Sequence, residues 1–582
     1  MEKDKKFNNL FLTSMAMVAI TAYLSIALGK NINEIYFWGI SISIVLLMLG
    51  LVARSKSIFY KNLKQVRENY GKENKREREF EDIKLLFDIF KYKNPEDIYI
   101  DDQTYLDFNM DKVFNKVDRT LSSPGEQYLY HILRNPILKQ EKLINRNKNI
   151  SFFQHNKEIR EKIQVSLLKL GRPRNNTITS FLWNEISYKT SLLPLLYLLS
   201  ILACGSLASI AFIGISRAFP FIFIILAANS YISIKIKKQI GSEIESMGYL
   251  GKVISIAEVM GKIEDKEIKE YTLKLKEKAK VCKVIMKKAT SIGIGRIEGV
   301  DILYEYFNLF FLIEARGFYK IIDEVKSHIE EIRSVYLILG EIDALISVAS
   351  YREGLLEYAE PKLTKGFKAI KAENIKHPLV EAAVGNSLTI EKGVIITGSN
   401  MSGKSTFLRA IGLNALFAQT IFTCLATSYE GGYFNIVSSM TVSDNVISGK
   451  SYYLSEAEAI FRIINDCNEE VTNLCLIDEI FRGTNPIERV NASTEILAYL
   501  SRHNSLVAVA THDLDITNML GDLYECYYFT ENVGEQGLEF DYQIRKGVSS
   551  TRNAIKVLEF MGYPKEITYR TNERISKSQH KE

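Results

Sequence analysis

The stretch VIITGSNMSGKSTFLRA, Val394–Ala410, decides the fold of the C-terminal part of the chain. Val394–Thr397 is apolar and β-favouring, which predicts a buried strand. Gly398 then begins the pattern G-x-x-x-x-G-K-[ST], which ends at Gly403–Ser405. Thr406–Leu413 continues as a predicted helix. Strand, glycine-rich loop and helix in this order predict a phosphate-binding loop.

Each position in this loop has a chemical role. Gly398 and Gly403 let successive N–H groups face an anion, and the positive end of the following helix points to the same place. Lys404 would reach the β- and γ-phosphates, and the Ser405 hydroxyl would bind Mg²⁺. The loop therefore predicts ATP and Mg²⁺ as cofactors.

A second apolar run, Leu474–Ile477, ends in two adjacent acids. Asp478 suits the Mg²⁺ shell, and Glu479 suits orienting or activating the attacking water. Alone, this run would fit a strand end with solvated acids equally well. Together with the phosphate-binding loop, it favours an ATPase with Lys404 and Glu479 in catalytic roles.

A third apolar run, Leu506–Ala510, is followed by Thr511 and His512. His512 would lie at the carboxyl edge of a parallel sheet, where the ligand sites of open α/β folds gather. A histidine after a strand is usually structural, but this position favours a catalytic role as a sensor of the γ-phosphate.

The site residues resemble those of one family. GSNMSGKST (398–406) resembles the G-x-N-M-x-G-K-S-T loop of the MutS DNA mismatch-repair ATPases, and DEIFRGT (478–484) is similar to their DE-x-x-R-G-T segment. Three more stretches resemble further segments of the same ATPase domain: IKHPLV (375–380), ISGKSYYLSEAEAI (447–460) and ATHD (510–513). The resemblance is dense over about 362–571 and implies that Asn400 and Thr406 also bind the nucleotide.

Two residues depart from the family pattern. Ser402 and Phe481 both stand where the family usually has glycine. In the family, ATPase domains pair so that a signature serine of one subunit meets the γ-phosphate held by its partner. That role would fall on Ser451, which implies a homodimer formed through the ATPase domains. Ser451 could instead only cap the helix that begins after it.

Helical segments are predicted upstream. The second half of Ile100–Ile137 is similar to the opening of the family's core and lever region. Apolar residues at helical spacing predict one lever-like amphipathic helix over Ile321–Leu339. Gly71–Asp82, GKENKREREFED, is rich in charge and is interpreted as a solvated linker or helix face.

Four apolar runs are long enough to cross a bilayer of ~30 Å, which takes ~20 helical residues. They are Phe7–Gly29, Ile35–Ala53, Thr190–Ser216 and Ala218–Ile234. A turn around Arg217 would make the last two a hairpin. The alternatives are buried helices of the lever region or, for the first run, a signal peptide.

Basic residues flank the runs asymmetrically. The outer ends carry Lys3, Lys5, Lys6, Arg54, Lys56, Lys61, Lys64, Arg67, Lys235, Lys237 and Lys238. The two hairpin tips offer only Lys30 and Arg217. The positive-inside rule then predicts a multi-pass protein of the cell membrane with its ATPase domain in the cytoplasm.

The predicted fold is a C-terminal α/β P-loop ATPase domain of the MutS-like or ABC type, an α-helical lever and core domain, and four transmembrane helices. The predicted domains are a transmembrane hairpin (1–58), the first part of the helical core (59–188), a second hairpin (189–236), the second part of the lever (237–358) and the ATPase domain with a C-terminal helix-turn-helix (359–582). Six cysteines without a C-x-x-C pair predict reduced, structural thiols.

Three functions fit these patterns. A MutS-like ATPase could act on duplex DNA, although the net charge of +5 does not by itself indicate nucleic acid. Family members that detect mismatches carry an N-terminal Phe-x-Glu wedge, and the first apolar pair takes that place here, so strong mismatch preference is not expected. An ATP-gated membrane scaffold for an unidentified protein partner fits nearly as well. An ABC-type transporter would show an L-S-G-G-Q motif, which the sequence lacks.

Overall fold

The computed structural model divides the chain into two compact units, each built from several segments. The described residues are 2–173, 177–184, 192–283, 285, 301–399, 401–440, 452–467, 470–482, 484–534, 537–548, 558 and 561–579. Unit 1 comprises Met1–Ile89, Asp118–Leu129 and Asn149–Gly354, and unit 2 comprises Phe90–Val117, Tyr130–Lys148 and Leu355–Glu582. Residues 90–117 and 130–148, assigned by sequence to the helical core, thus cluster with the C-terminal region. The other predicted domain boundaries remain predictions.

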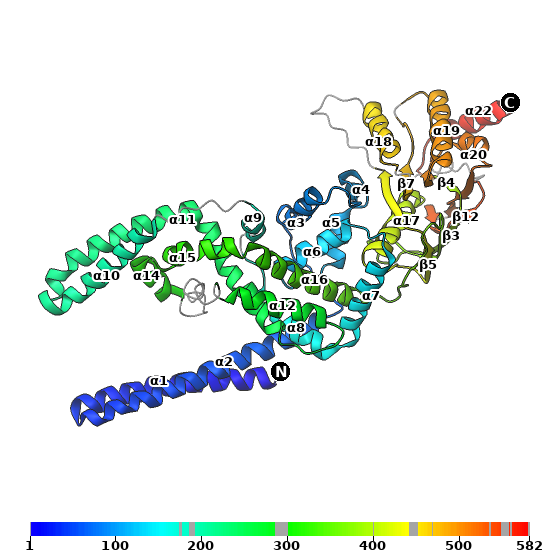
Figure 1. Cartoon of the computed structure of the whole chain (residues 1–582). Helices are drawn as coiled ribbons and strands as arrows, with labels where there is room; N and C mark the ends of the chain where they lie inside the picture. Colours follow the sequence, from blue (N-terminus) through cyan, green and yellow to red (C-terminus); the bar gives the residue numbers. More distant parts are fainter. Residues whose placement is uncertain are drawn as a thin grey trace. The chain divides into compact units, whose positions relative to one another are not determined.

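The centre of unit 2 is a mixed sheet with the order β12-β9-β4-β8-β7-β6 in the described residues (Figure 1). Its strands are β4 (Gly393–Thr397), β6 (Phe434–Ser439), β7 (Thr472–Asp478), β8 (Ser505–Ala510), β9 (Tyr524–Tyr528) and β12 (Arg545–Lys546). All neighbours pair in parallel except β12 and β9. The three predicted strands are confirmed as β4, β7 and β8, and they are adjacent in the order 4-8-7.

Helices and a second sheet complete unit 2. The helices α4 (Asp102–Asp107), α5 (Met110–Val117), α17 (Lys404–Thr420), α18 (Tyr452–Asp466), α19 (Pro486–Arg502), α20 (Leu514–Met519) and α22 (Lys565–Gln579) belong to it. The second sheet has the order β1-β5-β2-β3, with β1 (Lys362–Leu363), β2 (Ile370–Ile375), β3 (Asn386–Ile390) and β5 (Ser428–Gly431), and β10 (Glu531–Gly534) pairs with β11 (Gly537–Phe540). The α/β character predicted from sequence is confirmed. Residues 549–557, in the predicted helix-turn-helix, lie outside the described part.

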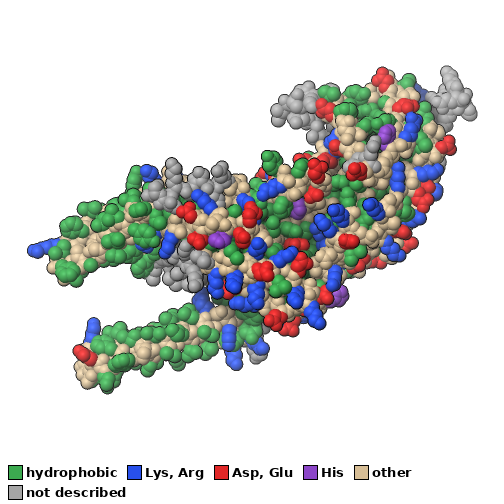
Figure 2. Space-filling view, in the orientation of Figure 1, with side chains coloured by type: hydrophobic (Ala, Val, Ile, Leu, Met, Phe, Trp, Pro, Cys, Tyr) green, Lys and Arg blue, Asp and Glu red, His purple; other side chains and the backbone are tan. Residues whose placement is uncertain are grey.

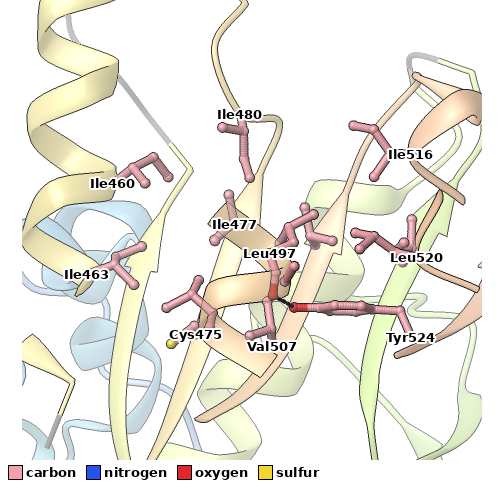
Figure 3. Close-up of a cluster of buried hydrophobic side chains, with 14 of the residues drawn as sticks. Ile460, Ile463, Cys475, Ile477, Ile480, Leu497, Val507, Ile516, Leu520 and Tyr524 are labelled. Atoms are coloured by element: carbon pink, nitrogen blue, oxygen red, sulfur yellow. Dashed lines mark hydrogen bonds between the residues drawn. The ribbon is translucent and has the colours of Figure 1, made fainter. Parts of the chain in front are cut away.

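A buried apolar cluster fixes the strands that end at the predicted site (Figure 3). It joins β7 and β8 to α19 through Ile477, Val509 and Leu497, each 1% exposed or less, and it also includes residues of α18 and α20. Tyr524 Oη donates to the Leu497 carbonyl at 2.7 Å, which satisfies the one polar atom of this ring inside the cluster. Burying a side chain of this size contributes ~1.5–3 kcal/mol, so β7 is held firmly up to Asp478.

Unit 1 is helical in the part that the structure describes. Its helices are α1 (Glu2–Asn31), η1 (Glu34–Trp38), α2 (Gly39–Asn69), α8 (Lys157–Leu170), α9 (Ile178–Trp183), α10 (Leu193–Ile213), α11 (Ile215–Met260), α12 (Lys269–Val281), α14 (Asp301–Phe311), α15 (Ile313–Ser327) and α16 (Ile329–Glu353). Three more, α3 (Phe80–Lys93), α6 (Ser123–Arg134) and α7 (Gln140–His155), pass from one unit into the other.

The predicted single helix over Ile321–Leu339 is wrong, because the chain breaks at His328. His328 has φ −120° and ψ 24° and separates α15 from α16. Ser327 Oγ and His328 Nδ1 both bond to the Glu324 carbonyl, at 2.9 and 3.0 Å, and local side-chain bonds of this kind compete with the helical ladder. Both helices bury their apolar residues, so the periodicity continues across the break.

The interpretation of Gly71–Asp82 as a solvated linker is also wrong in part. Arg78 is 2% exposed in its side chain and its Nε lies 2.9 Å from Asp118 Oδ2. Arg76 pairs with both Asp118 and Glu126. Burial raises the pKa of Asp118, but the positive charges of Arg172, Arg78 and Arg76 lower it by a larger amount. The pKa of Asp118 is therefore below its ordinary value. Part of the charged segment Gly71–Asp82 therefore forms ion pairs within unit 1.

Four helices in the described residues are long and apolar enough to cross a membrane: Lys3–Asn31, Glu34–Asn69, Leu193–Ile213 and Ile215–Met260. Figure 2 shows hydrophobic side chains covering both hairpins that they form. Small polar residues join the first pair, since Ser14 Oγ donates to the Leu46 carbonyl at 2.6 Å and Thr21 bonds to Ser43 at 2.7 Å.

The second hairpin turns earlier than predicted. Gly214, with φ +74°, separates α10 from α11, and Arg217 lies inside α11. Glycine adopts this left-handed conformation without the steric cost of a Cβ. The apolar run alone did not mark the turn, because Gly214 is itself uncharged.

Candidate nucleotide-binding site

The predicted phosphate-binding loop connects β4 to α17. Gly398 has φ +141° and Gly403 has φ +106°, and α17 begins at Lys404. A Cβ on Gly398 would lie 2.8 Å from the Phe529 carbonyl oxygen. Both glycines are therefore required by the backbone, and the helix N-terminus that follows is a suitable anion site.

Lys404 lies inside the loop. Its side chain is largely buried, and its Nζ donates to the carbonyls of Gly398 and Ser399, each at 2.8 Å. The Ser402 hydroxyl, in a position where glycine was expected, is buried without a hydrogen-bond partner in the described residues. An ammonium group, an unpaired hydroxyl and a helix N-terminus around one loop fit a phosphate group.

Asp478 and Glu479 end β7 beside the end of β8. Asp478 pairs in register with Ala510, and the Glu479 N–H donates to the Ala510 carbonyl at 2.9 Å. Glu479 has φ +63°, a conformation that costs about 1 kcal/mol or more in residues other than glycine. The backbone bond to Ala510 holds Glu479 in this conformation.

The Glu479 carboxylate has two partners. Its Oε1 accepts from His512 Nδ1 at 3.1 Å, and its Oε2 lies 2.6 Å from Arg482 Nε. The hydrogen bond with His512 lowers the pKa of Glu479, against the effect of burial. The same bond raises the pKa of His512 above 6.5. His512 thus contacts the predicted catalytic acid directly.

A cavity of about 800 Å³ lies along the loop. Its polar and charged lining residues are Gly403, Lys404, Ser405, Thr406, Asp478, Glu479 and Arg482, and its other lining residues include Ile375, His377, Val380, Val384, Phe529 and Tyr542. Burial lowers the pKa of His377 to about 4, so this ring is neutral at neutral pH. The cavity therefore combines charged groups with apolar and aromatic side chains, and a nucleotide needs both.

Sequence reasoning placed most of these residues correctly on elements that meet here. Gly398 begins the loop, and Gly403, Lys404, Ser405, Thr406, Asp478 and Glu479 line the cavity. His512 touches Glu479 but does not line the cavity. Asn400 and Ser451 lie outside the described residues, so their predicted roles stay predictions.

Other residues of the site were missed. Arg489 donates to Asp513 through two nitrogens, each at 2.8 Å, and Glu456 Oε1 accepts from the Arg482 N–H at 3.1 Å. Three of these residues, Arg482, Arg489 and Asp513, lie in or next to the motifs identified in the sequence. That position is the sequence signal from which they could have been predicted. Their partners are 24 or 26 residues away, and no local pattern links them.

Phe481 takes the place of a family glycine and keeps a glycine-like backbone. Its φ is +59°, it is 7% exposed, and its ring centroid lies 5.4 Å from that of Tyr453 on α18. Burial of a Phe side chain, worth ~1.5–3 kcal/mol, offsets a left-handed backbone that costs ~1–2 kcal/mol. Phe481 therefore packs the site loop against α18.

Parallel strands, a glycine loop that begins a helix, and two acids at the end of a neighbouring strand define a P-loop nucleotide-binding domain. Comparison with known proteins gives the same class in finer terms, since residues 394–579 match the family model for MutS domain V. This part of the chain is therefore similar to MutS domain V.

Curated relatives match slightly less than half of the chain. It is 30% identical over 280 residues to the DNA mismatch repair protein MutS of Petrotoga mobilis, covering 46% of this chain and 33% of that protein. It is 30% identical over 282 residues to the DNA mismatch repair protein MutS of Thermus thermophilus, covering 47% of this chain and 34% of that protein. The chain spans about a third of the length of these relatives.

Proposed function

We propose that the chain is a membrane-anchored ATPase that binds and hydrolyses MgATP. The observation that carries the proposal is that Lys404, Ser405, Asp478 and Glu479 all line a single cavity. Lys404 would neutralise phosphate charge, and Ser405 and Asp478 would hold Mg²⁺, which would supply further positive charge to the phosphates. Glu479 would orient the attacking water, and His512 would hold the Glu479 carboxylate in position.

The test is phosphate release from ATP by the purified full chain, with Mg²⁺ and after chelation. Release that persists after chelation would contradict the roles given to Ser405 and Asp478. The apolar and aromatic side chains that line the cavity, among them Val380, Phe529 and Tyr542, would contact the base. Backbone and side chains there offer stacking and van der Waals contact.

We further propose a homodimer in which Ser451 completes the site of the partner. The support is the match to MutS domain V, together with α18, which begins directly after Ser451 and contacts the site loop through Tyr453 and Phe481. A second polar surface over a bound nucleotide would make occupancy stabilise the dimer.

Mixing two inactive variants tests the dimer. Ser451→Ala and Lys404→Ala should each lack hydrolysis alone, but an equal mixture should regain about a quarter of wild-type activity, because random pairing makes half the dimers mixed, each with one complete site. The regained activity should be greatest near equal amounts. No recovery at any ratio would contradict action across the dimer.

The membrane anchor is supported by the four apolar helices and by the lysines and arginines that flank them. The full chain should remain in the membrane fraction after high-salt and alkaline washing, since four spans hold far more apolar surface than a wash can solvate. Deleting 1–53 alone should not release the protein, because the second hairpin remains. Release of the intact chain into either wash would remove the transmembrane assignment.

DNA is a second candidate ligand, because the relatives named above are DNA mismatch repair proteins. The lysine-rich α12 region offers a limited surface for phosphates, since Lys274 pairs with Glu270 at 2.7 Å and Lys278 lies 3.9 Å from Glu331. Binding carried by backbone charge alone is strongly salt-dependent and indifferent to base pairing.

We therefore expect weak duplex binding by the solubilised chain, with no more than about a twofold preference for mismatched DNA, because stronger discrimination needs an inserted side chain. A competition assay at two salt concentrations, with and without ATP, measures this. A preference of about tenfold would contradict it. No binding at low salt would instead favour an ATP-gated scaffold for a protein partner.

A further inference from the structure

The helix α14 lies against the second hairpin. It contacts α10 and α11, and it precedes α15 in the chain (Figure 1). Its sequence, DILYEYFNLFF, is rich in aromatic and aliphatic residues. Tyr306 and Phe307 are 67% and 55% exposed, although both are large aromatic side chains.

The end of α14 is bonded to polar side chains inside the two apolar spans. Ser200 Oγ of α10 donates to the Phe311 carbonyl at 2.8 Å, and Asn229 Nδ2 of α11 donates to the Phe310 carbonyl at 2.6 Å. Asn229 is fully buried. Ser200 precedes the turn at Gly214 by 14 residues and Asn229 follows it by 15, so both lie about 21–22 Å from the tip at 1.5 Å per residue.

That level is inside the spans and near their basic end. Asn229 precedes Lys235, the first lysine after the apolar run, by 6 residues, or about 9 Å along the helix. Ser200 lies 7 residues into α10, at a matching distance from its start. An interfacial helix lies with its apolar face buried about 5–10 Å into the boundary of the acyl chains, and α14 ends at such a depth.

The chain turns at this point and leaves toward the charged end. Leu312 has φ +53°, and α15 begins at the next residue. Glu314 lies 4.0 Å from Lys237, and the guanidinium of Arg316 lies 5.4 Å from the ring centroid of Tyr197. Lys237 and Tyr197 are both nearer to the basic end of the hairpin than Asn229 and Ser200 are, so the start of α15 lies nearer to that end than the end of α14 does.

The hydrogen bonds at the turn are those that a bilayer demands. The last carbonyls of a helix have no partner within it, and hydrocarbon offers none. Asn229 satisfies the Phe310 carbonyl, and Ser200 Oγ lies 2.8 Å from both the Phe311 and the Leu196 carbonyls, so its one proton is shared between them. The N-terminal side of the turn is closed by Asn308, whose Oδ1 accepts from the Glu314 N–H at 2.9 Å and whose Nδ2 donates to Glu314 Oε2 at 2.8 Å. A helix end in water would need none of these bonds.

We propose that α14 and the start of α15 form a re-entrant element that enters the bilayer from its basic side, with Tyr306 and Phe307 in contact with lipid. The inference rests on the proposed membrane anchoring and adds a lipid-contacting element to the four spans. Its occupant is the acyl-chain and glycerol region of the bilayer, because α14 packs against α10 and α11, which themselves expose large apolar side chains along the proposed spans.

Quenching of tryptophan by brominated lipid tests the position of α14. Trp38 and Trp183 are replaced by phenylalanine in the full chain, and a single tryptophan is introduced as Phe307→Trp. The protein is reconstituted in vesicles of phosphatidylcholine and phosphatidylglycerol that carry bromine near the glycerol end of the acyl chains. We expect emission to fall by about twofold or more. Tyr92→Trp, at a residue 89% exposed in α3, is the control expected to be unquenched.

A second tryptophan separates this inference from the anchor itself. Phe223→Trp, at a residue 61% exposed in α11 and 9 residues after Gly214, should be quenched by bromine in the middle of the acyl chains. If Phe223→Trp is quenched and Phe307→Trp is not, the re-entrant element is wrong and the anchor stands. If neither is quenched, the membrane anchoring itself is wrong.

The hydrogen bond from Asn229 provides a matched pair of variants. Asn229→Leu leaves the Phe310 carbonyl without its donor, and should reduce the quenching of Phe307→Trp by about half or more. Ser230→Ala removes only a bond to the Leu226 carbonyl within α11 and should leave that quenching unchanged. Quenching at Phe223→Trp should persist in both. Equal quenching of Phe307→Trp in the two variants would contradict the role of Asn229.

Discussion

Lys404→Ala should lower the affinity of the full chain for MgATP by at least about 100-fold. Lys404 Nζ lies within the loop with both donated bonds at 2.8 Å, and phosphate oxygens would take the place of the two carbonyls. Each hydrogen bond to a charged group contributes ~1.5–3 kcal/mol, and every 1.4 kcal/mol is a factor of about ten in affinity. Loss of two such bonds therefore exceeds a hundredfold. Equilibrium binding of a fluorescent ATP analogue, with competition by ATP, measures the change.

Lys392→Ala is the matched control for this loss. Lys392 is exposed in the turn before β4, and its Nζ lies 3.5 Å from the Asp522 carbonyl. The control has the same change of charge in the same domain, so it should keep wild-type affinity. Thermal unfolding of both variants shows whether the fold is retained. A folded Lys404→Ala protein with the affinity of Lys392→Ala would place the phosphates elsewhere.

Glu479→Gln should stop hydrolysis and keep binding. A positioned general base contributes about 10²–10⁴-fold to rate, and the amide has the same shape but cannot accept a proton from water. We expect the turnover rate to fall by roughly that factor, with ATP affinity within about threefold of wild type because Lys404 and Ser405 remain. Single-turnover hydrolysis and the binding assay separate the two quantities. Equal loss of binding in Lys404→Ala and Glu479→Gln would mean that Glu479 supports the loop and not the water.

The contact between His512 and Glu479 should make the stability of the fold depend on pH. His512 has a pKa raised above 6.5, first by its hydrogen bond to Glu479, and Glu479 has a pKa lowered below 4.5 by that bond. The contribution of His512 to stability is complete below pH 6.5 and is lost as pH rises through its folded-state pKa. The contribution of Glu479 is complete above pH 4.5 and is lost as pH falls through its own. The pair therefore stabilises the fold most between pH 4.5 and 6.5.

NMR titration of the His512 ring measures this coupling. In Glu479→Gln the His512 pKa should fall toward 6.5, because the neutral amide no longer favours the imidazolium. Glu488→Gln is a suitable control, since Glu488 is an exposed acid in the first turn of α19 that accepts from Thr484 at 3.2 Å. A His512 pKa that does not differ between the two variants would show that the contact with Glu479 is not made in solution.

Local patterns predicted the strands, the loop and the acids of the site. Gly398, Gly403 and Lys404 stand within seven residues, and steric limits on φ leave few other folds for such a stretch. Asp478 and His512 could be placed because buried strands that run in parallel end at one edge of a sheet. The elements and the site were thus predictable where short-range geometry alone decides the outcome.

Other features depend on partners distant in sequence. Arg78 is charged and was expected in water, but Asp118, 40 residues away, brings it into the interior of unit 1. The break at His328 leaves the apolar periodicity unchanged, because α15 and α16 face the same core. The position of α14 follows from bonds to Ser200 and Asn229, which lie 111 and 81 residues before their acceptors. No short sequence motif contains both members of any of these pairs.

Flotation of reconstituted vesicles with Mg²⁺-dependent ATP hydrolysis as the readout tests the membrane-anchored ATPase most directly. The full chain is reconstituted, washed at alkaline pH and floated, and hydrolysis is measured in the floating and bottom fractions for the wild type and Glu479→Gln. The activity should float with the lipid in the wild type and fall by roughly 100-fold or more in the variant, whose protein should still float. Activity that stays at the bottom with the protein, or that floats equally in Glu479→Gln, would contradict the proposal.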